Sequence, residues 1–223
     1  MAPLRGGARV LRRPKPALDE LAVLDGVVDG GGRDPKLGSR RVSFALLPST
    51  AEIASATELE WRRQLRSVAG QLPEGKFMGA LDWAKRFAEG KADEHTYSFA
   101  LVKEGGSHAT ALVELTHALA GQPDAWLKML RVIVEPSLDL SGQVTPIETV
   151  QELARVAAFI LLHGLGLAVK ELPARELKVW GITPLTTVFL DTIASALAEG
   201  EALKGVLSVE VKGNWLVLGF NGP

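Results

Sequence analysis

Two apolar stretches decide the fold: TYSFALV at residues 96–102 and ATALVEL at residues 109–115. Between them lies Glu104-Gly105-Gly106-Ser107, a composition typical of a turn that joins two strands. The pair therefore predicts a β-hairpin. The second stretch continues as ALVELTHALA at 111–120, which fits the period of a helix as well as that of a strand. A helix that begins there stays an alternative.

Upstream of this hairpin, VSFALL at 42–47 predicts a short buried strand. Ser49 and Glu52 then have the spacing of a capping box, which predicts a helix over 49–69. A second helix is predicted over 77–88. In the first helix we expect four apolar side chains to face the core: Ile53, Leu59, Leu65 and Val68.

Downstream, Pro123 begins a stretch, 123–134, that predicts a further helix, because proline is tolerated at a helix start. VAAFILLHGLGLAV at 156–169 would reach about 21 Å as a helix, short of the roughly 30 Å of a bilayer core. We interpret it as a buried helix that runs into a turn near Gly164, with an extended stretch at 167–169. The sequence therefore predicts no membrane span.

The dipeptide Thr-Pro occurs at 145–146 and again at 183–184, each time in the arrangement that opens a helix. An apolar extended stretch follows each predicted helix. The second is a hairpin over 206–211 and 215–218 with its turn at Gly213-Asn214. The pattern predicts a helix-plus-hairpin unit used twice, at 145–180 and 183–220.

These elements predict an α+β fold class. We expect a mainly helical, single globular body over 42–223, with two short β-hairpins, and a flexible, basic, Gly/Pro-rich N-terminal arm over 1–41. Charge separates the two parts. Nine cations and five acids precede Val42, whereas 16 cations and 21 acids follow. The first 18 residues hold five cations and no acid.

Sequence-independent nucleic-acid binding needs cations that follow a phosphate backbone, and a basic arm spaced by Gly and Pro supplies them. The expected nucleic-acid-binding residues are Arg5, Arg9, Arg12, Arg13, Lys15, Arg40 and Arg41. A solvated terminus without a partner, and an arm that reaches onto an acidic neighbouring subunit, stay open as alternatives.

No motif identifies a reaction. The chain has no cysteine, which excludes disulfides and thiol nucleophiles. Residues 70–76 match the G-x-x-x-x-G-K spacing of a phosphate loop, but Phe77 stands where the magnesium-binding hydroxyl is needed. The four histidines lack metal-binding spacing, so we expect no catalytic residue, metal or cofactor. The five tryptophans are assigned to packing, although base stacking on them is conceivable.

The sequence thus favours a non-enzymatic, self-associating structural protein, similar to coat and nucleocapsid proteins in its charge layout only. Its partners would be further copies of itself and nucleic acid, with the strand over 215–218 as an edge for pairing. We expect an intracellular location or one within an assembled particle. An arginine-rich start without acids also fits an organelle transit peptide.

The alternative is an enzyme or small-ligand-binding protein whose site is assembled from residues distant in sequence. Four side chains are available to it: Ser107, His108, His117 and His163.

Overall fold

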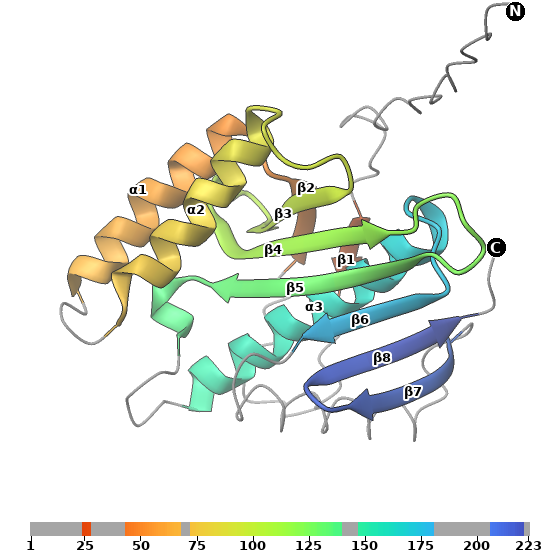
Figure 1. The fold of residues 1–223 in the computed structure, drawn as a ribbon. Coiled ribbons are helices and arrows are strands. Elements are labelled where there is room, and N and C mark those ends of the chain that lie inside the picture. Colours follow the sequence, from red (N-terminus) through yellow and green to blue (C-terminus); the bar gives the residue numbers. More distant parts are fainter. Residues whose placement is uncertain (1–23, 28–42, 68–71, 140–146, 181–205, 221–223) are drawn as a thin grey trace, which may run out of the picture.

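A computed structural model describes residues 24–27, 43–67, 72–139, 147–180 and 206–220. These residues form one sheet of eight strands, in the order β1-β2-β3-β4-β5-β6-β8-β7, together with three α-helices (Figure 1). Neighbouring strands are antiparallel except β5 and β6, which are parallel. The prediction of a mainly helical body is therefore wrong: the fold is a mixed sheet with helices on both faces.

The central hairpin is confirmed as β3 (Thr96–Lys103) and β4 (Ala109–Ala118), and the helical alternative for its second half is wrong. Both strands lie inside the sheet, and the first seven residues of β3 are all buried. A strand covered on both faces carries apolar side chains at nearly every position. This explains why the sequence of β4 also fits the period of a helix.

The strand predicted before the first helix is present as β2 (Ser43–Pro48), which pairs with β1 (Leu24–Val27) and β3. Helix α1 (Ala51–Ser67) follows, but its cap is Thr50, whose Oγ1 accepts a hydrogen bond from Ile53 N at 3.3 Å. Ser49 instead bonds Ser98 on β3. The expected inward position of Leu59 is wrong, because that side chain is 73% exposed.

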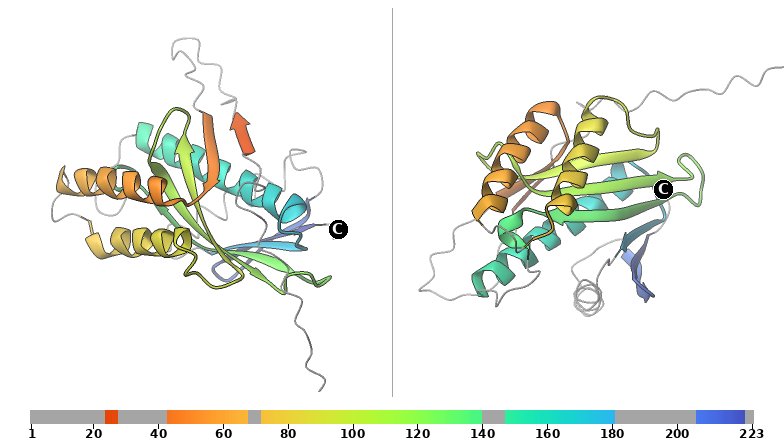
Figure 2. Two further views of the ribbon diagram at one scale, coloured as in Figure 1. Left: turned by 90° about the horizontal axis from the view of Figure 1, so that it is seen from above. Right: turned by 60° about the vertical axis from the view of Figure 1, so that its left-hand side comes forward.

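Helices α1 and α2 (Glu74–Ala88) cover one face of the sheet, and α3 (Ile147–Lys170) covers the other (Figure 2). Each face has its own apolar core. Under α1 and α2, Trp61 packs edge-on against Phe77, with ring centroids 5.9 Å apart. Under α3, Phe159 packs against Phe44 at 5.0 Å.

Residues 126–134, predicted as part of a helix over 123–134, form strand β5 (Trp126–Val134). Pairing with β4 on one side and β6 on the other overrides the local helical propensity, which is a weak determinant. Leu127 and Met129 belong to the α3 core, whereas Ile133 belongs to the α1–α2 core. The strand therefore supplies apolar side chains to both faces.

Helix α3 continues through Gly164 to Lys170, so the predicted turn and the extended stretch at 167–169 are wrong. Gly164 lets the helix approach the sheet closely: a Cβ there would lie 3.0 Å from Met129 Cε and 3.3 Å from Leu177 Cδ2. No helix among the described residues has the length and apolarity needed to cross a membrane.

The last hairpin is confirmed as β7 (Val206–Lys212) and β8 (Trp215–Phe220), with Gly213 at φ 60° in its turn. Strand β8 lies between β7 and β6 (Glu176–Trp180), so the expectation that it forms a free edge is wrong. The helix predicted from Thr183 lies outside the described residues. The proposed repeat and the division into arm and body stay predictions.

The parallel pair β5 and β6 stays joined over only part of its length. Its register runs from Trp126 opposite Glu176 to Met129 opposite Val179. In the pairing of β5 with β4, Leu130 has no partner and forms a bulge. A bulge bends its strand and increases the twist. Beyond it, residues 131–134 pair with β4, and among the described strands nothing pairs with their other side.

Candidate functional site

The end of the parallel pair is the position where a ligand site is expected in this topology. In open sheets, ligands bind beyond the carboxyl ends of parallel strands. Helix α3 follows β5 on one face of the sheet, and α1 and α2 cover the other face (Figure 2). We call residues 130–134 of β5 and 179–180 of β6 the β5–β6 fork.

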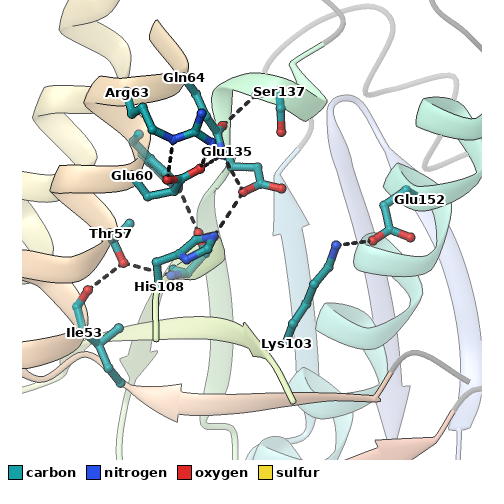
Figure 3. Close-up of polar contacts among 12 residues, drawn as sticks. Ile53, Thr57, Glu60, Arg63, Gln64, Lys103, His108, Glu135, Ser137 and Glu152 are labelled. Atoms are coloured by element: carbon teal, nitrogen blue, oxygen red, sulfur yellow. Dashed lines mark hydrogen bonds and ion pairs between the residues drawn. The ribbon is translucent and has the colours of Figure 1, made fainter. Parts of the chain in front are cut away.

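A polar cluster lies at the carboxyl end of β5 (Figure 3). It is centred on Gln64 of α1, whose Nε2 donates to Glu60 at 3.0 Å and to Glu135 at 3.1 Å. Its Oε1 accepts from Ser137 N at 3.0 Å. His108 Nε2 lies 3.7 Å from Glu135 Oε2. We call Glu60, Gln64, His108 and Glu135 the Gln64 cluster.

The backbone next to His108 is held by two side chains of α1. Thr57 Oγ1 accepts from Ala109 N at 2.8 Å, and Trp61 Nε1 donates to Ala109 O at 2.9 Å. The next residue, Thr110, is a bulge in the pairing of β4 with β3, and its carbonyl accepts from Glu135 N at 2.8 Å. These bonds fix the start of β4, and thereby His108, against α1 and the end of β5.

The two carboxylates of the cluster have different surroundings. Arg63 donates to both oxygens of Glu60 and, with Gln64, lowers the pKa of that carboxyl to about 2. Glu60 therefore stays ionised at any working pH. Glu135 is 7% exposed and faces His108, whose side chain is 35% exposed. A half-exposed imidazole beside a buried carboxylate is an arrangement that can accept and return a proton.

Gln64 is expected to be essential to the order of this cluster. Changing Gln64 to Glu replaces the amide donor with an acceptor between two carboxylates, at a residue that is only 9% exposed. We expect the free energy of unfolding to fall by about 1–3 kcal/mol, the cost of leaving buried polar groups unpaired. Urea denaturation measures it. Gln122, exposed in the loop before β5, is the control: Gln122→Glu should change stability little.

The remaining histidines lie away from this cluster. His95 is exposed, and His163 is buried inside α3, where its ring stacks on Phe159 at 6.0 Å. His117 is buried on β4 and donates from Nε2 to Pro173 O at 3.1 Å. Burial lowers the pKa of His117. Of the four side chains that the enzyme alternative named, only His108 joins a polar cluster; Ser107 is exposed in the turn.

The lowered pKa of His117 makes stability depend on pH. An unfolded histidine has a pKa of about 6.5, so below that pH the unfolded chain binds more protons than the folded one. The free energy of unfolding should therefore fall as pH drops from about 6.5 towards the folded pKa. His117→Gln keeps a donor for Pro173 O but does not titrate, and should flatten this fall. Urea titrations at neutral and mildly acidic pH test this prediction. A fall in stability in His117→Gln as steep as that of the unchanged protein would contradict the assignment.

The predicted nucleic-acid-binding residues all lie outside the described residues: Arg5, Arg9, Arg12, Arg13, Lys15, Arg40 and Arg41. Of residues 70–76, which match the spacing of a phosphate loop without its hydroxyl, Glu74 to Lys76 open α2, and Lys76 forms an ion pair with Asp139 at 2.5 Å. In the part of the chain that the structure describes, no group of three potential metal ligands comes together.

Sequence reasoning missed three residues of the cluster: Glu60, Gln64 and Glu135. Glu60 is one of several acids on α1 and has no signal of its own. The sequence signal of the other two is weak. Gln64 is a glutamine on the inward side of α1, and Glu135 is an acid that directly follows an apolar stretch and precedes Pro136. The sequence pattern assigns the segment before Glu135 to a helix, so the position of this acid at the end of a strand could not be used.

No family model matches this chain, and no curated protein matches it significantly. Similar folds occur among solved structures of acetyltransferases. One is AtaT complexed with acetyl-methionyl-tRNAfMet, with 10% identity, 80% of this chain and 94% of that chain covered, and a TM-score of 0.42. Another is the N-acetyltransferase PseH of Campylobacter jejuni, with 11% identity and a TM-score of 0.39; the match covers 78% of this chain and 95% of that chain. A third is an acetyltransferase of Thermus thermophilus, with 16% identity and a TM-score of 0.35; the match covers 81% of this chain and 97% of that chain.

These neighbours correct the functional prediction. The chain was expected to be a non-enzymatic, self-associating, capsid-like protein, whereas the solved structures similar to it are enzymes. The likeness is remote, so residue roles and substrates have to be argued from the geometry of this chain.

Proposed function

We propose that this protein is an enzyme that binds an extended, amide-bearing ligand along the β5–β6 fork and transfers a group from it at the Gln64 cluster. One observation carries the proposal. Residues 131–134 of β5 lack a strand partner on the β6 side among the described strands, and this unpaired stretch leads directly to Glu135.

The backbone of the fork supports one class of ligand. A strand that lacks a partner presents a row of N–H and C=O groups, which bind an extended chain through main-chain hydrogen bonds. The four residues 131–134 extend over about 13 Å at 3.3 Å per residue. A slender arm with amide groups matches such a row. The pantetheine arm of coenzyme A is a chain of this type with two amides, so an acyl thioester of coenzyme A is the donor we propose.

The Gln64 cluster supplies the proton chemistry of an acyl transfer. His108 takes the proton from an acceptor amine or alcohol as its nitrogen or oxygen attacks the thioester carbonyl. The new C–N or C–O bond forms, the C–S bond breaks, and His108 returns the proton to the departing thiolate. Glu135, 3.7 Å from His108, stabilises the imidazolium that forms in between. Gln64 acts through Glu135 and is a positioning residue.

Calorimetry with three probes tests the ligand class. Acetyl-coenzyme A and pantetheine both carry the amide arm, whereas adenosine 3′,5′-bisphosphate carries only the charged end. We expect acetyl-coenzyme A to bind, pantetheine to bind more weakly, and the bisphosphate to bind weakest. Binding of the bisphosphate as tight as that of acetyl-coenzyme A, with none for pantetheine, would remove the argument from the fork.

We further propose that the basic arm, residues 1–41, contacts nucleic acid through its phosphates. The charge separation along the sequence supports this, with five cations and no acid in the first 18 residues. Fluorescence anisotropy with a labelled duplex should show binding that weakens with salt and is lost on deletion of residues 1–16. Equal binding by the truncated chain would contradict it.

A further inference from the structure

Three of the five tryptophans lie on one face of the sheet. They are Trp126 on β5, Trp180 on β6 and Trp215 on β8. Side chains alternate along a strand, and the neighbours of these tryptophans, among them Leu127 and Leu216, belong to the core under α3. The tryptophans therefore point to the opposite side.

No described helix covers this side of β6, β8 and β7, whereas α1 and α2 lie over the other half of the sheet (Figure 1). Trp180 and Trp215 are directly opposite each other and their ring centroids are 4.6 Å apart. The three tryptophan residues are partly exposed, although the indole nitrogen of Trp126 is buried. We call the three tryptophans, with Lys128, Lys178 and Lys212, the tryptophan face.

The lysines of this face lie among the rings. Lys178 Nζ is 4.7 Å and Lys128 Nζ 5.5 Å from the centroid of the Trp126 ring, and the two lysines are paired across the strands. Glu176 forms an ion pair with Lys178 at 2.8 Å, and Glu210 with Lys212 at 2.6 Å. Lys128 has no carboxylate within ion-pair distance among the described residues. The face is thus aromatic with an excess of positive charge.

The positions of the tryptophans along the strands suit two separate, non-adjacent bases. Trp126 is opposite Glu176 on β6, and Glu176 lies four residues before Trp180. The two tryptophan positions are therefore about 13 Å apart along the strand direction. Both paired lysines lie between these two positions. Open four-stranded sheets that bind RNA stack two or three bases on their aromatic side chains, and every base has a face that can stack.

We propose that the tryptophan face binds single-stranded nucleic acid, with bases stacked on Trp126 and on the Trp180–Trp215 pair and phosphates near the lysines. A duplex keeps its bases stacked inside and cannot use the indoles. The proposal concerns a surface separate from the Gln64 cluster and does not depend on the acyl-transfer proposal.

Titration of the full chain with labelled oligouridine, followed by anisotropy and by quenching of tryptophan fluorescence, tests this site. We expect the double change Trp180→Ala and Trp215→Ala to weaken binding at least about tenfold, the effect of losing one stacked base. The matched change of both residues to Phe keeps aromatic rings and should restore most of the affinity. Unchanged affinity in the Ala variant, or no recovery in a folded Phe variant, would overturn the proposal.

Two controls separate this face from other modes of binding. The double change Lys128→Gln and Lys178→Gln should reduce the slope of log K against the logarithm of the salt concentration by about 1.4. Lys91 is exposed and lies outside the tryptophan face, so Lys91→Gln should leave this slope unchanged. A duplex of the same length reports binding through the arm alone, so loss of duplex affinity in the Trp→Ala variant would contradict base stacking. A dimer that dissociates on the same Trp→Ala change, without any oligouridine binding by the original chain, would assign the face to a second copy and overturn the proposal.

Discussion

Replacing His108 by glutamine is expected to lower the turnover of acyl transfer by about 10²- to 10⁴-fold, the usual contribution of a positioned general base. Glutamine keeps a polar side chain at a half-exposed position, so the fold should be preserved. His108 would contact the acceptor and not the amide arm of the donor, which lies along residues 131–134. The affinity for acetyl-coenzyme A should therefore change little.

The release of free thiol from acetyl-coenzyme A, in the presence of a panel of amine and alcohol acceptors, measures this effect. The change His95→Gln, at an exposed histidine outside the cluster, is the control and should leave turnover unchanged. Equal turnover in the two variants would remove His108 from the chemistry. A proportional loss in His95→Gln would show that the effect is not specific to the cluster.

The second large effect is structural. Trp61→Ala should lower the free energy of unfolding by about 3–5 kcal/mol, the usual cost of truncating a fully buried aromatic side chain. Trp61 is 0% exposed, packs against Phe77 and donates to Ala109 O at 2.9 Å. Since whole domains are stable by only about 5–15 kcal/mol, this change should bring the protein close to unfolding.

Trp61→Phe separates packing from hydrogen bonding. It keeps most of the buried ring and leaves the carbonyl of Ala109 without its donor, which should cost about 1–3 kcal/mol. Because Ala109 follows His108, we expect turnover in the folded Phe variant to fall as well. Urea denaturation monitored by circular dichroism gives the stabilities. A Phe variant as unstable as the Ala variant would contradict the division between the two roles.

The sequence predicted the local hairpins well and the rest of the sheet poorly, for physical reasons. In both hairpins the two paired strands are separated only by a short turn, whose residues, Gly105-Gly106 and Gly213-Asn214, can be recognised in the sequence. Strand β5 is different because its partners are β4 and β6, and β6 follows only after the 24-residue helix α3. Nothing local to residues 126–134 reveals that pairing.

The site shows the same limit. His108 was among the residues available to an enzyme, but its neighbours Gln64 and Glu135 are 44 and 27 positions away and meet it only through the fold. Neither bulge can be predicted from periodicity, because Leu130 and Thr110 are ordinary strand residues. The basic arm, which was predicted from charge alone, led instead to the prediction of a structural protein.

Hydrogen exchange of the full chain, with and without acetyl-coenzyme A, tests the central claim most directly. A ligand paired with the free side of β5 should slow exchange at those backbone amides of residues 130–134 that do not bond to β4, and leave the last hairpin turn at Gly213-Asn214 unaffected. Saturating acetyl-coenzyme A that leaves these amides of residues 130–134 exchanging as in the free protein would contradict the account.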